Sequence, residues 1–86
     1  MNFEYDPTKS EKNQEKHGIG FEEAQKLWED SRAVVFHARS DDEPRFAMIA
    51  AYKGKLWVAF YTLRENRIRI ISVRRVRKGE KVLYES

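Results

Sequence analysis

The 86-residue sequence predicts an α+β fold in which two N-terminal helices pack on one face of a mostly antiparallel sheet. Helix-capping residues and helical spacing of apolar side chains occur within residues 6–30. Runs of β-branched and aromatic residues fill much of residues 32–76. Short turns separate these runs, so successive strands are expected to lie antiparallel. We expect one domain over residues 1–86.

The first predicted helix, residues 7–17, lacks an apolar stripe. Asp6 suits its N-cap, Pro7 its first turn, and Gly18 the position after its end. It contains no Ala, Val, Ile, Leu, Met or aromatic residue. At about 100° per residue, four polar side chains share one face: Lys9, Asn13, Lys16 and His17. This stripe is expected to face an anion. The alternative is a solvated helix whose lysine stems lie over the sheet.

The remaining elements follow along the chain. Residues 21–30 have apolar side chains at helical spacing, which predicts a second helix with one buried face. Five strands are expected, over residues 2–5, 32–38, 45–52, 56–63 and 67–76. The tail is long enough for a short C-terminal helix, which Gly79 disfavours. Because the helices cover one face of the sheet, the other face is expected to receive a partner.

Alternation of side chains predicts which residues of the last strand share a face. Ile68 and Ile70 are expected to face the core, so Arg67 and Arg69 should point away from it. Continued to the end of the strand, the rule gives one face with Arg67, Arg69, Ile71, Val73 and Arg75, and the other with Ile68, Ile70, Ser72, Arg74 and Val76.

Charge is distributed unevenly along the chain. Residues 1–45 carry seven Lys and Arg against eleven Asp and Glu, whereas residues 46–86 carry ten against three. The basic second half favours an anionic partner, of which nucleic acid is the commonest large one, or else a solvated basic edge. The chain has no cysteine, which excludes disulfides and thiolate metal sites. It shows neither a signal-peptide layout nor a membrane-length apolar run, so we expect a cytoplasmic protein without membrane contact.

Four segments resemble the BrnT-type toxins of type II toxin–antitoxin systems. The first runs from Phe3 to Ala24 and reads F-E-Y-D-x-x-K-x-x-x-N-x-x-K-H-G-I-x-F-E-E-A. The others are E-x-R-F at 43–46, V-A-F-Y-T-x-R at 58–64, and I-R-I-I-S-V-R-R at 68–75, followed by Glu80 and Tyr84. The resemblance spans nearly the whole chain, in order.

The resemblance implies a RelE-like domain that cleaves RNA without a metal or other cofactor and so inhibits translation. It also implies a partner, a ribbon-helix-helix antitoxin of the BrnA type, in a heterotetramer with two copies of each chain. Operator DNA would then be contacted only through the antitoxin.

Metal-free RNA cleavage needs a base for the 2′-hydroxyl proton, an acid for the leaving 5′-oxygen and cations for the phosphoryl oxygens. Arginine suits the last role because it is planar, permanently charged and bidentate. The expected catalytic residues are Arg69, Arg64, Arg74, His17 and Lys16. The expected RNA contacts are Lys9, Asn13, Arg67, Arg75 and Tyr84, with Tyr84 also a weaker candidate acid. Arg69→Ala is expected to lower cleavage far more than His17→Ala.

Each assignment has an alternative. Arg64 could form a surface ion pair, and Arg74 and Arg75 could contact the RNA backbone or acidic side chains of the antitoxin. The two histidines do not have the spacing of a metal site. Two other functions are open: a nucleic-acid-binding or co-repressor subunit without catalytic activity, and a protein-interaction module that docks a partner strand or helix on the exposed sheet and the side of Trp57 and Tyr61.

Overall fold

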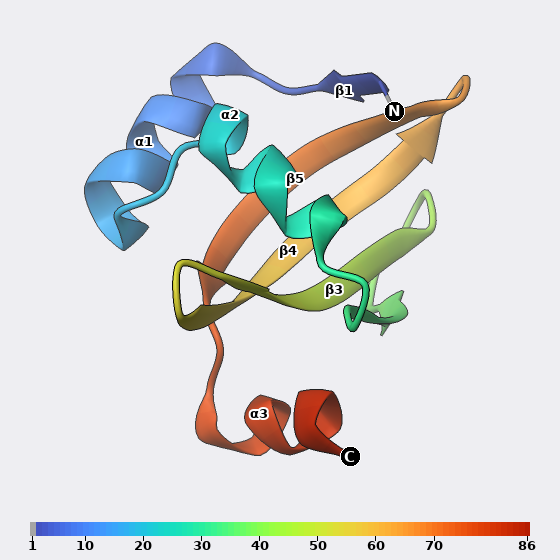
Figure 1. Cartoon of the computed structure of the whole chain (residues 1–86). Coiled ribbons are helices and arrows are strands. Elements are labelled where there is room, and N and C mark those ends of the chain that lie inside the picture. Colours follow the sequence, from blue (N-terminus) through green and yellow to red (C-terminus); the bar gives the residue numbers. More distant parts are fainter. Residues whose placement is uncertain (1) are drawn as a thin grey trace.

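The computed structural model describes residues 2–86, so Met1, the first residue of the expected domain, lies outside it. The chain forms a five-stranded mixed sheet with the strand order β1-β5-β4-β3-β2 (Figure 1). The strands are β1 (Asn2–Glu4), β2 (Val34–Ala38), β3 (Arg45–Tyr52), β4 (Lys55–Arg64) and β5 (Arg67–Arg75). The helices are α1 (Pro7–His17), α2 (Phe21–Ala24), the 3-10 helix η1 (Gln25–Glu29) and α3 (Lys78–Glu85).

The α+β class is confirmed, and three details differ from the prediction. The second helix is α-helical only over α2 and continues as η1. The sheet is mixed, because β1 lies parallel to β5 while the other strand pairs are antiparallel. The C-terminal helix α3 forms despite Gly79. This glycine lies in the first turn, where the backbone N–H groups have no partner within the helix.

Two tight hairpin turns join the three central strands. Lys53 and Gly54 connect β3 to β4 with φ angles of 51° and 73°. Glu65 and Asn66 connect β4 to β5 with φ angles of 46° and 68°. Two successive positive φ angles are typical of type I′ turns, whose twist matches that of the strands they join. These turns fix the register of β3, β4 and β5.

One face of the sheet carries the larger part of the core. The helices α1, α2 and η1 lie on this side (Figure 1). Phe21, Ala24 and Leu27 from α2 and η1 are fully buried there. They belong to one cluster with side chains of the sheet, including Met48, Ala50, Trp57, Ala59, Tyr61, Ile70 and Val73. We call this the helix face.

The polar helix α1 is held to the sheet by the side chain of Asn13. Its amide nitrogen donates hydrogen bonds to the carbonyl oxygens of Ile19, at 2.8 Å, and Val73, at 2.9 Å. Its amide oxygen accepts a bond from the Val73 N–H at 3.2 Å. Ser10 adds a further contact by accepting a bond from the Phe21 N–H at 2.8 Å. Buried hydrogen bonds therefore attach this helix where an apolar stripe would otherwise do so.

A β-bulge reverses the predicted alternation in the second half of β5. Tyr61 pairs with Ile70 and Phe60 pairs with Ser72, so Ile71 has no partner on β4. An extra residue moves every later side chain to the opposite face. Arg75 consequently lies on the helix face beside Trp57, and Arg74 lies on the opposite face beside Val58. The predicted faces are therefore wrong for Ser72, Val73, Arg74, Arg75 and beyond.

The opposite face, which we call the open face, is covered only in part. Ala47, Ile49 and Val58 are buried on it, and Tyr84 of α3 packs against them. Two contacts hold α3 in place. Arg74 forms a bidentate ion pair with Glu80, and the Tyr84 hydroxyl donates to Asp30 Oδ2 at 2.7 Å. The prediction left this face entirely to a partner, whereas α3 occupies part of it.

Candidate nucleic-acid interface

The sheet separates the candidate residues named from the sequence into two groups. Arg64, Arg67, Arg69 and Arg74 lie on the open face, as the strand registers show. Lys9, Lys16 and His17 lie on α1, and Arg75 lies beyond the bulge on the same side of the sheet as α1. The cations of the first helix and the last strand therefore converge only in part.

The three arginines expected to be catalytic each contact a glutamate. Arg64 donates to Glu43 at 2.8 Å, Arg69 to Glu4 at 2.9 Å and Arg74 to Glu80 at 2.8 Å. The ion pairs raise the pKa of Arg64 and of Arg74. The hydrogen bonds from Arg74 lower the pKa of Glu80 to about 2. The alternative of a surface ion pair for Arg64 therefore describes the structure, with Glu43 as the partner.

Two further candidates are occupied by structural contacts. Asn13 is 8% exposed, and its amide group bonds to the backbone around it. It therefore attaches α1 to the sheet. The hydroxyl of Tyr84 is bound to Asp30, a contact that raises the pKa of Tyr84. Burial would raise the pKa of Asp30, but hydrogen bonds from the Ala51 N–H and Tyr84 more than offset it, so that pKa is lowered.

His17 and Arg75 line one cavity. Its volume is about 430 Å³, and Lys53, Lys55 and Trp57 also line it. His17 is the last residue of α1, the lysines flank the turn between β3 and β4, and Arg75 is the last residue of β5. Three elements that lie far apart in the sequence thus bring an imidazole, a guanidinium and two ammonium groups to one place.

A second, smaller hollow adjoins this cavity through His17. Its volume is about 210 Å³, and it is lined by Lys9, Lys12 and Lys16 together with Ser72 of β5. We call the two hollows together the basic strip, which consists of Lys9, Lys12, Lys16, His17, Lys53, Lys55 and Arg75. A strip of basic groups that includes a histidine suits the backbone of a single-stranded nucleic acid.

The basic strip contains little opposing charge. Its one lining carboxylate is Glu23, which accepts a bond from the Tyr52 hydroxyl at 2.9 Å and lies 3.5 Å from Lys53 Nζ. Contacts with Tyr52 and Glu23 raise the pKa of Lys53. Within residues 2–86, no carboxylate lies within 4.0 Å of the other strip cations. These groups are therefore available to phosphate.

The guanidinium of Arg75 is positioned by its neighbours. Its Nε donates to the carbonyl oxygen of Leu56 at 3.2 Å. The group lies over the ring of Trp57, 5.4 Å from the centroid. Neither contact neutralises the charge, and both restrict the side chain, so the arginine is prepared to bind an anion at low entropic cost.

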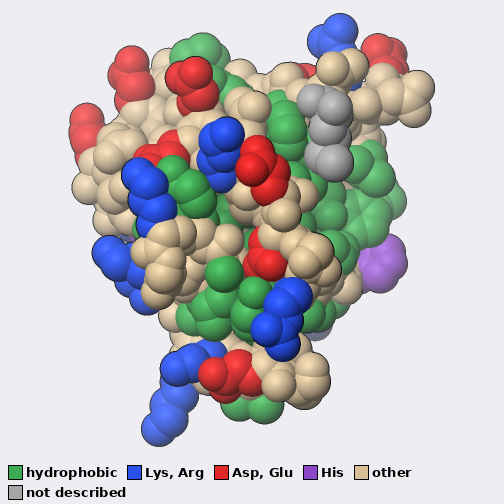
Figure 2. All heavy atoms as spheres, in the orientation of Figure 1, with side chains coloured by type: hydrophobic (Ala, Val, Ile, Leu, Met, Phe, Trp, Pro, Cys, Tyr) green, Lys and Arg blue, Asp and Glu red, His purple; other side chains and the backbone are tan. Residues whose placement is uncertain are grey.

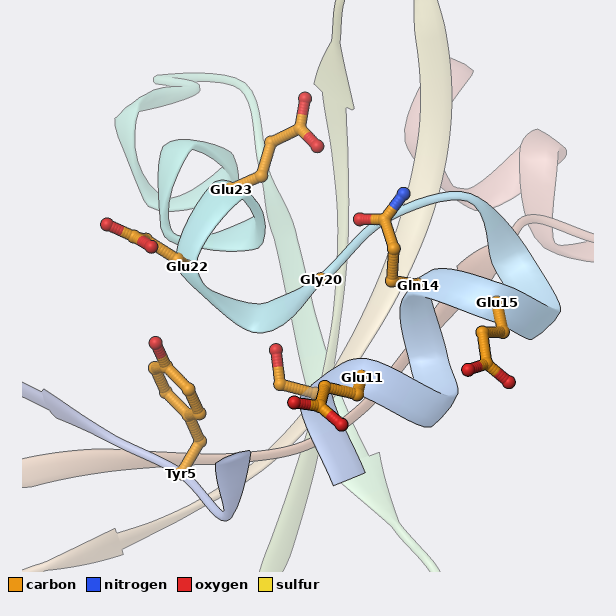
Figure 3. A pocket seen from close by; sticks show the side chains of 8 residues that line it. Tyr5, Glu11, Gln14, Glu15, Gly20, Glu22 and Glu23 are labelled. Carbon is orange, nitrogen blue, oxygen red and sulfur yellow. The ribbon is translucent and has the colours of Figure 1, made fainter. Parts of the chain in front are cut away.

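A larger cavity between α1 and α2 has the opposite charge. Its volume is about 610 Å³, and it is lined by Tyr5 and by four carboxylates: Glu11, Glu15, Glu22 and Glu23 (Figure 3). Figure 2 shows carboxylates gathered over these helices, with basic groups lower on the left, near the end of α1. The acidic cavity would repel a polyanion, so the size of a cavity does not identify the site here.

Sequence reasoning missed Lys12, Lys53 and Lys55, and it considered Trp57 only as part of a docking side for a protein partner. The signal for the two lysines was the segment K-G-K, which was interpreted only as a hairpin turn. Nothing in the sequence places that turn beside the end of α1. The bulge at Ile71 also had no sequence signal, and it is what brings Arg75 to this side.

Two further features concern metal binding and membrane spans. Within residues 2–86, no group of three or more His, Cys, Asp or Glu side chains is arranged to hold a metal ion. No helix in this part of the chain is both long enough and apolar enough to cross a membrane.

Comparison with protein families gives one match over most of the chain. The model of a family described as the ribonuclease toxin BrnT of type II toxin–antitoxin systems matches residues 5–80. Comparison with curated protein sequences gave no match. The matched range includes every residue of the basic strip.

Proposed function

Because this chain belongs to the BrnT family of ribonuclease toxins of type II toxin–antitoxin systems, we propose that it cleaves RNA at the basic strip without a metal. The observation that carries the proposal is the cavity in which His17, Lys55 and Arg75 meet, where the one lining carboxylate, Glu23, lies against Lys53. Such a cavity supplies both an imidazole, which can accept and donate a proton, and fixed positive charge for a phosphate.

The chemical step is attack by the neighbouring 2′-hydroxyl on phosphorus. His17 takes the hydroxyl proton, the bond from O2′ to phosphorus forms, and the bond from phosphorus to O5′ breaks. Lys16, beside His17 on α1, is assigned to protonate the leaving O5′. The products are a 2′,3′-cyclic phosphate and a 5′-hydroxyl, and no external reactant is consumed.

Arg75 and Lys55 are assigned to the phosphoryl oxygens. Negative charge grows on these oxygens as O2′ approaches, so cations fixed beforehand stabilise the transition state more than the ground state. Lys9 and Lys12 are assigned to the flanking phosphates in the adjoining hollow. These groups would position the strand without reading its sequence.

A competing placement puts the scissile phosphate at Arg64, Arg69 and Arg74 on the open face. The glutamates bound to these arginines argue against it, because each would have to release its arginine or face the phosphate. The order predicted from the sequence, with Arg69→Ala more damaging than His17→Ala, belongs to this competing placement.

Incubation of purified protein with RNA in EDTA tests the proposal. The parent should produce fragments that end in 2′,3′-cyclic phosphate. Arg75→Ala and His17→Ala should each slow cleavage by about 10²-fold or more. Arg69→Ala tests the competing placement, and Arg32→Ala, at an exposed arginine outside both sites, is the matched arginine control. Loss of RNA cleavage in Arg69→Ala, together with full cleavage by Arg75→Ala, would contradict the proposal. A shifted but intact RNA band would favour the non-catalytic binding subunit.

We further propose that the RNA cleavage inhibits translation and that the antitoxin neutralises it. Membership of a type II family implies an antitoxin partner. We expect a ribbon-helix-helix protein of the BrnA type in a complex of two chains each, through which alone operator DNA is contacted. Expression of this chain should arrest growth, and co-expression of the neighbouring gene should restore it. Healthy growth in both cases would count against a toxin.

A further inference from the structure

We infer that the open face of the sheet binds the antitoxin through an acidic, partly apolar segment of that protein. The inference rests on the proposed function only in taking an antitoxin as the partner. The surface is centred on four arginines, which we call the arginine face: Arg45, Arg64, Arg67 and Arg69. These side chains come from three adjacent strands, β3, β4 and β5.

The strand registers bring these arginines together around Thr62. Thr62 pairs with Arg69 on β5, and Arg64 pairs with Arg67. Phe46 pairs with Tyr61, so the next residue pair across β3 and β4 sets Arg45 beside Thr62. Thr62 therefore has an arginine on each neighbouring strand, in the centre of the face.

The arginine face already holds carboxylates. Glu43 binds Arg64 through two contacts, at 2.8 Å to Nη2 and 3.4 Å to Nε, and Glu4 binds Arg69 at 2.9 Å. Both glutamates come from its margins, β1 and the loop before β3. These pairs show that guanidinium groups on this face bind carboxylates.

Part of this surface has no ion pair, although Asp41 and Asp42 line a hollow together with Arg45. Among residues 2–86, no carboxylate lies within 4.0 Å of Arg45 or Arg67, and both side chains are exposed. The hydroxyl of Thr62 has no hydrogen-bond partner although the residue is only 1% exposed. An unpaired buried hydroxyl lowers stability in the free protein.

The arginine face continues into an apolar area toward α3. Phe36, Ala38 and Phe60 are partly buried there, and Arg74 lies over the Phe60 ring, 5.2 Å from its centroid. The helix α3 leaves Val82 and Leu83 exposed, at 62% and 47%. Arginine and aromatic residues are enriched in protein–protein interfaces.

The balance of charge favours a protein partner over RNA on this face. Glu4 and Glu43 lie among its arginines, and a phosphate backbone would approach both. An acidic protein segment can place its carboxylates at Arg45 and Arg67 and apolar side chains at Phe60, which avoids the glutamates. The basic strip has one carboxylate among seven basic residues, so RNA has a better binding site there, on the side of the sheet that carries α1.

Charge reversal at Arg45 tests the inference, with the antitoxin encoded beside this chain as the probe. Arg45→Glu should raise the Kd of the full-length complex at least tenfold and leave RNA cleavage within twofold of the parent. Arg32→Glu, an exposed arginine outside both surfaces, is the matched control and should change neither value. As a measurement on the unmodified chain, antitoxin binding should shift the amide resonances of Thr62 and Arg69.

The outcomes separate the two proposals. Unchanged antitoxin affinity in Arg45→Glu, with no shift at Thr62, would overturn the inference. Loss of RNA cleavage in Arg45→Glu, when its thermal unfolding matches the parent, would place RNA on this face and overturn it as well. If the parent fails to cleave RNA but Arg45→Glu still weakens antitoxin binding, the docking surface stands and the nuclease proposal fails.

Discussion

Asn13 does for α1 what several apolar side chains do in an ordinary amphipathic helix. Its three hydrogen bonds reach Ile19 in the segment after the helix and Val73 of β5, so one amide joins two segments to α1. Val73 follows the bulge, in a part of β5 that β1 does not reach. The N–H and C=O of Val73 would otherwise be buried without partners, and this is why an amide side chain is needed here.

Replacement of Asn13 should therefore destabilise the fold. Asn13→Ala removes three buried bonds, each contributing about 1 kcal/mol, so we expect the free energy of unfolding to fall by about 3 kcal/mol. Urea denaturation measures this change. Gln14→Ala, which removes an exposed amide from the same helix, should cost less than about 0.5 kcal/mol. Equal stabilities of the two variants would mean that Asn13 does not attach the helix.

Among the elements, α3 depends most on electrostatics. None of its residues is buried, and Glu80 accepts two bonds from Arg74 and one from the Arg77 N–H. Bonds from Arg74 bring the pKa of Glu80 down to about 2 from the ordinary 4.5. The carboxylate form therefore stabilises the folded state above about pH 4.5, and this contribution is lost as the pH falls toward 2.

The pH dependence of stability tests this role. Glu80→Gln should lower the free energy of unfolding at pH 7 by up to about 3 kcal/mol and flatten its dependence on pH between 4.5 and 2. Chemical denaturation at a series of pH values gives both quantities. The control Glu85→Gln, at the exposed end of the same helix, should retain the slope of the parent. If Glu80→Gln kept the full pH dependence of the parent's stability, that dependence would come from another titratable group.

Some elements of the fold could be predicted from the sequence, and others could not. The first helix, the hairpin at Gly54 and the long strands follow from caps, turn residues and alternation, which are local signals. The bulge at Ile71 is a shift in the register between β4 and β5, and no single residue of the sequence predicts it. For this reason the arginines at the start of β5 were assigned to the correct face and those at its end were not.

At the scale of the whole molecule, the sheet separates two basic regions of different character. The basic strip holds cations with little neighbouring negative charge, whereas the arginine face mixes arginine with glutamate. Sequence charge alone predicted a basic second half and a basic helix. It could not predict which cations share a surface, because that depends on the packing of α1 against β5 and on the turn at Lys53 and Gly54.

We propose that RNA binds along the basic strip, between α1 and the end of β5. The two tryptophans provide matched reporters. Trp57 lines the cavity with His17 and Arg75. Trp28 packs against Phe3 and Tyr61, away from the strip.

The most direct test is an NMR titration of the ¹⁵N-labelled chain with a short RNA in which 2′-O-methyl groups block cleavage. We predict that the indole N–H resonance of Trp57 shifts progressively and that of Trp28 does not. Higher salt should weaken the binding steeply, since counterions are released from the strand. If the Trp57 resonance did not move while the amide resonances of Thr62 and Arg69 shifted, the RNA would lie on the open face. That result would contradict the proposed binding along the basic strip.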